Sequence, residues 1–288
     1  MNPWRPAVLL VLCSVAALAL AAGPAMVRIP GGETRIGSER GRPDEAPPFT
    51  VQLAAFDLDR TPVTVAAFQQ FVQQQGFVTE AEKFGSGAVM TFGTGQWKLL
   101  PGASWRQPLG PAAPAASANH PVTQVSWNDA SAYCAAVGKR LPSEVEYEHA
   151  ARGAKAQDRS HAFGEALEQK GRYRANVWTG VFPMINTAKD GYATTSPVGA
   201  FGEDSLGLAD MAGNVWEWTS DWYRPYAERT QPWPQGKLGE KVQRGGSFLC
   251  DPKFCYGFKV TARGHATPDS SHMHVGFRCA RSIYASPR

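Results

Sequence analysis

The sequence predicts a single α+β domain with little regular secondary structure, and three observations support this. The 288 residues include 29 glycines, 22 prolines and 9 tryptophans, a mixture typical of a loop-rich fold with short elements. Helical patterns occupy the first half of the chain, whereas short strand and turn patterns fill the second half. Hydrophobic residues make up 43% and charged residues 19%, so a sizeable core is expected.

The first expected elements are two strands and a helix. Val27–Ile29 and Phe49–Phe56 have the composition of strands. Thr64 is expected to N-cap a helix that Gly76 ends. The apolar face of this helix consists of Val65, Phe68, Phe71 and Val72.

Two further helices are expected near the middle of the chain. Asp129–Val137 reads as a short helix that stops before Gly138. Ser143 and Glu146 have the spacing of a capping box, which predicts a third helix ending at Gly153.

The remaining segments read as irregular. Phe84–Ser117 carries turn residues and isolated aromatics, and the Ala/Pro-rich stretch Pro111–Ala118 is its most linker-like part. From Asn176 onward only short strands and turns are expected. Residues 26–284 are therefore interpreted as one domain.

Residues 1–22 are predicted to be a signal peptide. Arg5 precedes the apolar run Ala7–Leu20, which is too short to span a bilayer comfortably. Ala19–Ala21 matches a small-residue cleavage site, and Gly23 follows soon after, which disfavours an uncleaved anchor or a buried core helix. The protein is therefore expected to be secreted or periplasmic.

The charge and the cysteines narrow the possible function classes. A net charge of +4, with no run of Lys and Arg, gives no reason to expect a nucleic-acid surface. Disulfides persist in an oxidising compartment. Four cysteines follow the signal segment, and four cysteines allow three pairings. They are Cys134, Cys250, Cys255 and Cys279.

Cys250 and Cys255 form the first candidate site. They lie five positions apart in a loop that follows Gly245 and Gly246 and contains Pro252. Two thiolates at close range bind a soft metal, and Cu(I) fits a site of sulfur donors alone. Zinc would usually require four ligands. A disulfide across this small loop is the alternative, and the spacing by itself favours it.

Oxygen-bearing residues suggest two further sites, because calcium accepts mixed shells of carboxylate and carbonyl oxygens. One set is Asp210, Gly213, Val215 and Glu217. The other set is Asn176, Val177, Asp190 and Tyr192. Neither spacing matches an EF-hand loop, so acids that cap turns or pair with arginines are the alternative.

The histidines and hydroxyl groups give weaker signals. His272 and His274 would lie on one face of a strand and could bind a metal, but solvated or hydrogen-bonded histidines are the favoured interpretation. Ser247 could act as a nucleophile, although no local residue supplies a base. The sequence contains no H-E-x-x-H, G-x-S-x-G or P-loop motif.

Six short motifs follow one another along the chain. They are His120-Pro121-Val122, Val125–Ala130, Gly138–Glu144, Gly213–Trp218, Arg244–Ser247 and Gly276–Arg278. Their order resembles the formylglycine-generating enzyme family of sulfatase-modifying proteins. The resemblance covers residues 26–280, and the Cys-x4-Cys pair after Arg-Gly-Gly-Ser marks the oxidase branch.

This resemblance implies a compact, irregular fold related to C-type lectin domains. It implies that Cys250 and Cys255 hold Cu(I) between two thiolates, where O2 oxidises a substrate cysteine to formylglycine. The substrate would be an unfolded sulfatase-type polypeptide with a Cys-x-Pro-x-Arg motif. Ser247 matches the active-site serine of the family, and Trp216 matches a tryptophan beside the copper.

The resemblance also assigns the remaining site residues. Both oxygen-rich sets match calcium sites of the family, and Cys134 and Cys279 match a disulfide. A second disulfide of some members falls here on Ala151 and Val260, so both of its partners are absent together.

This chain departs from the family at positions beside the cysteines. Asp251 and Phe254 stand where the family often has His and Tyr, and Tyr256–Lys259 replaces an alternating aromatic and basic run. These changes bear on rate and substrate preference. The alternative function is a lectin-like module that binds peptide or carbohydrate, with Cys250–Cys255 as an inert disulfide. An iron-dependent sulfoxide synthase is disfavoured because no H-x3-H-x-E motif occurs.

Overall fold

The computed structural model describes residues 24–155, 159–233, 238–255 and 257–283. The signal-peptide prediction for residues 1–22 lies outside these ranges and stays a prediction. Within them, no helix has the length and apolar character needed to cross a membrane.

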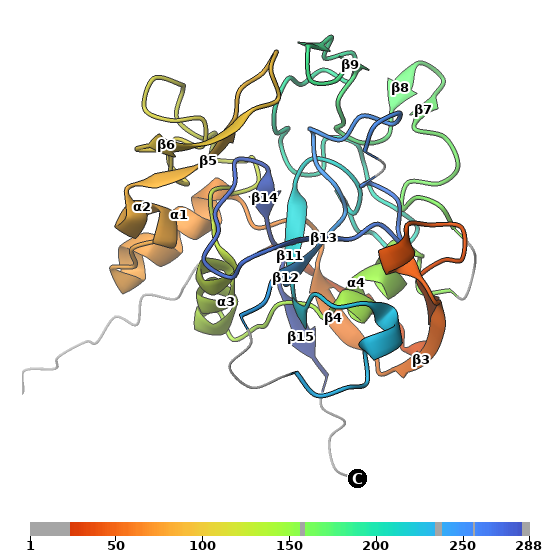
Figure 1. The fold of residues 1–288 in the computed structure, drawn as a ribbon. Coiled ribbons are helices and arrows are strands. Elements are labelled where there is room, and N and C mark those ends of the chain that lie inside the picture. The colour runs from red at the N-terminus through yellow and green to blue at the C-terminus, as the bar shows by residue number, and fades with distance from the viewer. Residues whose placement is uncertain (1–23, 156–158, 234–237, 256, 284–288) are drawn as a thin grey trace, which may run out of the picture.

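The two ends of the described chain meet in one small sheet. Its central strand is β4 (Phe56–Asp59), which pairs antiparallel with β1 (Met26–Ile29) on one edge and with β15 (Ala280–Ser282) on the other. Figure 1 shows β4 and β15 side by side in the lower part of the molecule.

The expected strand over Phe49–Phe56 is in fact two strands. β3 (Phe49–Leu53) pairs with β2 (Gly32–Ile36) in a separate two-stranded sheet, and β4 begins only at Phe56. The segment between β3 and β4 packs closely against Gly31. A Cβ on Gly31 would lie only 2.6 Å from the backbone nitrogen of Ala55. This close backbone approach separates the two strands and could not be read from the apolar pattern.

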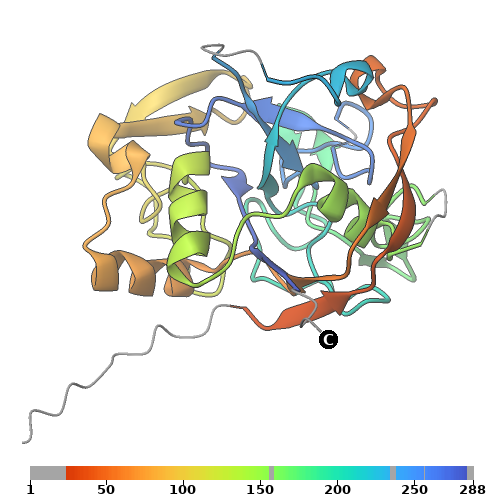
Figure 2. The same cartoon turned by 90° about the horizontal axis from the view of Figure 1, so that it is seen from below.

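Helix α1 (Val65–Gln75) confirms the predicted caps. Thr64 Oγ1 accepts a hydrogen bond from the backbone N–H of Ala67 at 3.2 Å. Gly76 ends the helix in the left-handed region, with φ of 58°, which glycine adopts without strain. Figure 2 shows this helix beside α3, and the rings of Phe71 and Tyr133 meet there with centroids 5.4 Å apart.

The other two predicted helices are present with adjusted ends. α3 (Trp127–Ala136) begins two residues before the expected Asp129, because Ser126 is its N-cap and Asp129 closes a capping box on it. α4 (Glu144–Ala151) has the predicted capping box of Ser143 and Glu146.

The prediction that Phe84–Ser117 lacks regular structure is wrong at its start. β5 (Ser86–Met90) and β6 (Trp97–Pro101) form an antiparallel hairpin. It follows α2 (Glu80–Phe84), which a capping box of Thr79 and Glu82 begins. The Thr-x-x-Glu signal was present in the sequence, whereas the β5 residues are mostly small and gave no strand pattern.

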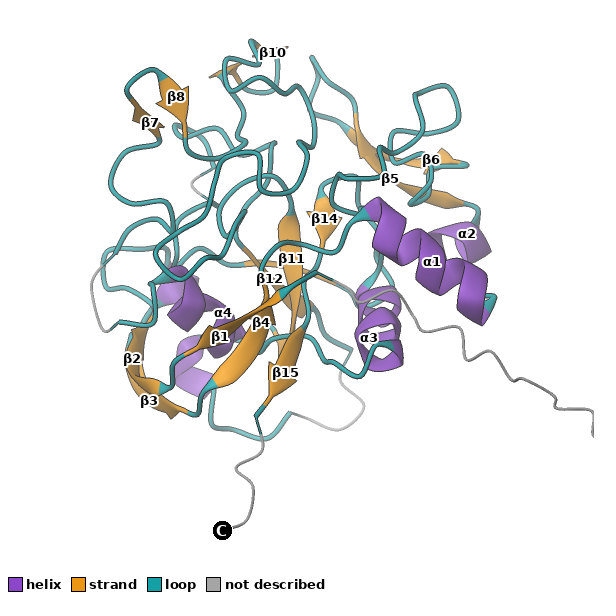
Figure 3. Ribbon diagram, turned by 180° about the vertical axis from the view of Figure 1, so that it is seen from behind, coloured by secondary structure: helices purple, strands orange, loops and turns teal. Residues whose placement is uncertain are grey.

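A four-stranded sheet lies at the centre of the second half, in the order β13-β12-β11-β14. Figure 3 shows that long loops fill the end of the molecule beyond this sheet. The sheet strands are β11 (Trp216–Trp222), β12 (Lys241–Arg244), β13 (Gly264–Ala266) and β14 (Val275–Gly276). Short elements complete the chain: η1 (Pro43–Glu45), β7 (Glu168–Gln169), β8 (Arg172–Tyr173), β9 (Gly180–Val181), β10 (Ile185–Asn186) and η2 (Tyr226–Glu228).

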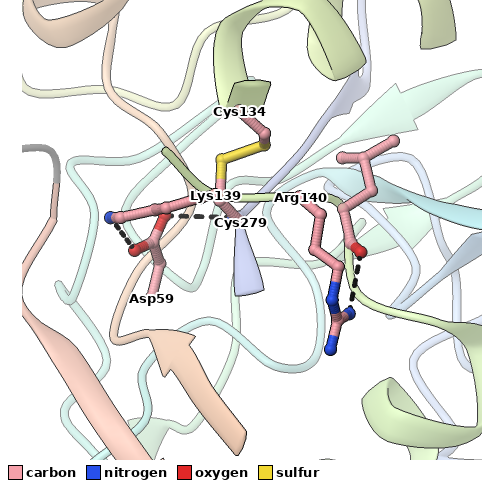
Figure 4. The surroundings of a disulfide bond; sticks show 6 residues. Asp59, Cys134, Lys139, Arg140 and Cys279 are labelled. Atoms are coloured by element: carbon pink, nitrogen blue, oxygen red, sulfur yellow. Dashed lines mark hydrogen bonds and ion pairs between the residues drawn. A yellow bond between two sulfur atoms is a disulfide. The ribbon is translucent and has the colours of Figure 1, made fainter. Parts of the chain in front are cut away.

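A disulfide joins Cys134 of α3 to Cys279 beside β15, as the family resemblance implies. Figure 4 shows it next to the ion pair of Lys139 and Asp59, whose nitrogen and oxygen lie 2.5 Å apart. Asp59 also accepts a hydrogen bond from the backbone N–H of Cys279 at 3.0 Å. Covalent and ionic contacts therefore fasten α3 to the sheet of the two chain ends.

Candidate active site

Two glycines carry the chain from β12 into the loop of the two free cysteines. Gly245 and Gly246 have φ angles of 93° and 72°, in the left-handed region. A Cβ on Gly245 would lie 2.5 Å from the Tyr147 hydroxyl, and one on Gly246 would lie 2.5 Å from the backbone nitrogen of Phe258. The site therefore requires glycine at both positions, as the sequence predicted for a tight loop.

The loop is anchored on both sides of the first cysteine. The backbone N–H of Phe248 donates to the carbonyl of Asn214 at 3.0 Å, and the N–H of Trp178 donates to the carbonyl of Cys250 at 3.1 Å. Phe248 and Leu249 are buried in a small apolar cluster with Trp178. These contacts fix the position of Cys250 beneath the surface.

Cys250 and Cys255 are both thiols, and their sulfur atoms lie 3.0 Å apart. The inert disulfide that their spacing favoured is therefore absent from this structure. Cys250 is buried, whereas Cys255 is partly exposed. Cys134 and Cys279 form a disulfide with each other, so they do not complete a four-cysteine zinc site.

The two thiols differ in acidity because they share one hydrogen bond. The bond to Cys255, together with burial, raises the pKa of Cys250 well above its ordinary value. The same bond lowers the pKa of Cys255, so Cys255 is the more easily deprotonated sulfur. The pair thus combines a buried thiol with a partly exposed thiol that loses its proton more easily.

Ser247 contacts the buried sulfur, and Trp216 belongs to the same core cluster as Cys250. The backbone N–H of Ser247 donates to Cys250 Sγ at 3.5 Å, and the Ser247 hydroxyl accepts from the N–H of Leu249. Gly257 lies close to both the indole and the sulfur, since a Cβ at this position would lie 2.5 Å from Trp216 Cζ2 and 2.8 Å from Cys250 Sγ. Ser247, Trp216 and Gly257 therefore surround the buried sulfur closely.

The two departures from the family have different consequences. Asp251 is buried, and its carboxylate accepts from the N–H of Lys253 at 2.6 Å, which caps the turn between the cysteines. Its charge raises the pKa of Cys255, but this is the smallest of the effects on that thiol. Phe254 is 71% exposed and stacks on Phe182, with ring centroids 5.2 Å apart.

The set Asn176, Val177, Asp190 and Tyr192 is drawn together in the structure. Asp190 accepts from the backbone N–H groups of Val177 and Tyr192 at 2.9 and 3.1 Å. Asn176 Oδ1 is buried without a hydrogen-bond partner. Such an orphaned acceptor beside a half-buried carboxylate fits a hard cation.

The set Asp210, Gly213, Val215 and Glu217 fits a cation less well. Arg278 donates to both oxygens of Glu217 at 2.6 and 2.8 Å, and the Tyr147 hydroxyl donates at 3.1 Å. The carboxylate charge of Glu217 is therefore already neutralised. Asp210 accepts from the N–H of Gly199 at 2.6 Å, and burial raises its pKa to about 6.

The two histidines of the His-x-His pair lie close to each other and to a tryptophan. The rings of His272 and His274 have centroids 5.9 Å apart, and Trp97 contacts both. No cluster of three or more His, Cys, Asp or Glu residues suited to a metal occurs in the described part of the chain.

Sequence reasoning missed Arg278 as the partner of Glu217 and Phe182 as the partner of Phe254. Arg278 belongs to the Gly-Phe-Arg motif, but 61 positions separate it from Glu217, so no local pattern pairs them. Phe182 precedes Pro183 in a turn and gave no signal.

Comparisons with known proteins find similar chains over most of the sequence. A sulfatase-modifying factor enzyme 1-like domain matches residues 15–283. A formylglycine-generating enzyme of Streptomyces coelicolor is 45% identical over 277 residues, covering 88% of each chain. The Mus musculus formylglycine-generating enzyme is 41% identical over 277 residues, covering 88% of this chain and 74% of its own. A second Mus musculus relative, an inactive C-alpha-formylglycine-generating enzyme 2, is 38% identical, covering 96% and 92%.

Solved structures share the fold. PvdO from Pseudomonas aeruginosa is 26% identical, with a TM-score of 0.68 over 90% of this chain and 95% of its own. Treponema denticola variable protein 1 is 21% identical, with a TM-score of 0.62 over 89% and 94%. The prediction of an irregular α+β fold related to C-type lectin domains is confirmed.

Proposed function

Because the chain belongs to the formylglycine-generating enzyme family, we propose that it oxidises a cysteine of a polypeptide substrate to Cα-formylglycine. One relative carries the word inactive in its name, so family membership alone does not settle catalysis. The observation that carries the proposal is the pair of free thiols of Cys250 and Cys255, 3.0 Å apart on a fixed loop.

Cys250 and Cys255 would hold one copper ion. Two facing sulfur donors suit Cu(I), which is soft and accepts few ligands. When bound, the ion would supply a soft centre for the substrate thiolate and electron transfer to O2. The partial exposure of Cys255 supports this assignment, because a substrate must reach the ion from the solvent side.

The chain's own residues would protect and orient this centre. The N–H of Ser247, 3.5 Å from Cys250 Sγ, would stabilise negative charge on the buried sulfur. The Trp216 indole, 9% exposed, would exclude water from the inner side. Asp251 would keep the turn closed through its bond to the N–H of Lys253.

The overall reaction balances with O2 and an external thiol. The substrate –CH2–SH group loses two protons and two electrons to give a thioaldehyde. Water then replaces the sulfur, which leaves as sulfide, and the aldehyde remains. Reduction of O2 to two water molecules takes four electrons, so a thiol reductant must supply the other two.

The substrate, the calcium ions and the location complete the proposal. We infer that the substrate is an unfolded sulfatase-type polypeptide with a Cys-x-Pro-x-Arg motif. Asn176 and Asp190, with the carbonyls of Val177 and Tyr192, would hold calcium. The predicted signal peptide would direct the protein to a secreted or periplasmic location, and the Cys134–Cys279 disulfide is compatible with this.

A peptide assay tests the proposed function. The protein is incubated with Cu(I), a thiol reductant, O2 and a peptide containing Cys-x-Pro-x-Arg, and the aldehyde is captured with a hydroxylamine probe. We expect an aldehyde that requires copper and O2, and no product from a peptide with Ser in place of the target Cys. A protein that binds the peptide but forms no aldehyde under any copper or O2 condition would instead be a lectin-like binding module.

A further inference from the structure

Five large apolar side chains are exposed at the end of the molecule that carries the thiol loop. We call this set the apolar rim. It comprises Phe92, Val181, Met184, Ile185 and Phe254, which are 42%, 62%, 62%, 61% and 71% exposed. Val181 and Ile185 face each other across the β9–β10 hairpin. Figure 1 shows this hairpin and the tip of the β5–β6 hairpin at the same end of the fold.

Aromatic rings, among them the buried Trp178, connect parts of the rim from beneath. Trp178 contacts Phe92 at 5.8 Å and Phe182 at 5.2 Å between ring centroids. Phe182 then stacks on Phe254 at 5.2 Å. The backbone N–H of Gly93 donates to the carbonyl of Pro183 at 2.9 Å, which joins the two hairpins.

The rim also leads directly to the thiol pair. Phe254 precedes Cys255 in the chain, and the N–H of Trp178 holds the carbonyl of Cys250 at 3.1 Å. Because Phe254 belongs to the rim and is the chain neighbour of the partly exposed Cys255, a ligand bound to the rim would lie beside that thiol. The occupant that we infer is the substrate polypeptide, whose target cysteine must reach the same thiol.

We propose that the apolar rim binds bulky apolar side chains of the substrate polypeptide outside the segment that reacts. This inference rests on the proposed function and specifies its substrate class: an extended chain with exposed Leu, Ile, Val or Phe near the target cysteine. Folded proteins bury such side chains, so the rim would favour unfolded substrates. Two of the rim side chains, Phe92 and Phe254, are held by ring contacts, which reduces the entropy that they lose when a ligand binds.

The test compares Val181→Ser/Met184→Ser/Ile185→Ser with the parent on three peptides. One peptide carries only the reacting motif, one adds Leu and Phe flanks, and one adds Ser flanks. We expect KM for the apolar-flanked peptide to rise on the order of tenfold, with kcat and the other two peptides unchanged. Phe84→Ser, which removes a 62% exposed ring from α2, is the matched control and should behave like the parent.

Two results of the kinetic comparison would overturn the inference. One is a parent that shows no preference for apolar over Ser flanks. The other is a triple variant whose KM for the apolar-flanked peptide equals that of the parent. If the parent converts no peptide, the Kd of the labelled apolar-flanked peptide is measured by fluorescence anisotropy instead of KM. Equal Kd values for the parent and the triple variant would then refute peptide binding at the rim. A dimer in sedimentation that the triple variant abolishes would assign the rim to a second copy of the chain instead.

Discussion

Replacing Glu217 by Gln should destabilise the protein by about 3–5 kcal/mol, the cost of leaving one partner of a buried ion pair without its counter-charge. Glu217 and Arg278 have side chains that are 0% exposed. The guanidinium of Arg278 also donates to four backbone carbonyls, so it stays buried when the carboxylate is lost. Those carbonyls belong to Asp59, Arg60, Ala209 and Asp210.

The assay is urea unfolding of the metal-free protein, followed by intrinsic fluorescence. Arg60 and Glu203 form a matched exposed pair, with side chains 49% exposed and a separation of 3.2 Å. Glu203→Gln is the control, and we expect it to cost less than about 1 kcal/mol because solvent screens that pair. If Glu217→Gln lowers the free energy of unfolding no more than Glu203→Gln does, the buried ion pair does not stabilise the protein as predicted.

The same variant separates an ion pair from a calcium ligand. We expect calcium to raise the Tm of Glu217→Gln by as much as it raises the Tm of the parent, because Arg278 already neutralises this carboxylate. A calcium effect that disappears in Glu217→Gln would show that this carboxylate is a ligand, and the account of this site would then be wrong.

Three further predictions concern the calcium set, the disulfide and the thiol pair. Asp190→Asn should abolish the calcium-dependent rise in Tm. A Tm that responds to calcium and chelator as in the parent would contradict the assignment of Asp190 as a calcium ligand. Cys134→Ala/Cys279→Ala should lower the free energy of unfolding by about 5 kcal/mol, since the bond closes a loop of 145 residues; an equal urea midpoint for variant and parent argues against this. Cys250→Ala should raise the pH midpoint for alkylation of Cys255 in metal-free protein, because the variant removes the hydrogen bond that lowers the pKa of Cys255 in the parent. A midpoint that is unchanged or lower would disprove the role of that bond.

Short sequence patterns predicted the helix caps, because a cap depends only on residues close together in the chain. Thr64, Gly76 and the capping box of Ser143 were readable because a cap involves atoms only a few positions apart. The predicted start of α3 at Asp129 is two residues late, because Asp129 is the third residue of the helix and closes the capping box that Ser126 opens.

Distant contacts could not be read from the chain. The pairing of Glu217 with Arg278 requires β11 to meet the segment before β15, which the fold alone determines. The same is true of Phe254, whose ring stacks on Phe182 from a different loop. The assignment of the disulfide and of the site residues came from the family resemblance, since the spacing of four cysteines leaves the pairing open.

The central claim is that Cys250 and Cys255 together form the reactive centre, and single-serine variants test it most directly. Cys250→Ser and Cys255→Ser are each assayed for aldehyde formation on the Cys-x-Pro-x-Arg peptide and for bound Cu(I), with urea unfolding to verify the fold. Hydroxyls are poor ligands for a soft ion, so we expect each variant to unfold like the parent, bind Cu(I) more weakly and form no aldehyde. Aldehyde formation at the parental rate by either variant in the presence of copper would contradict the claim.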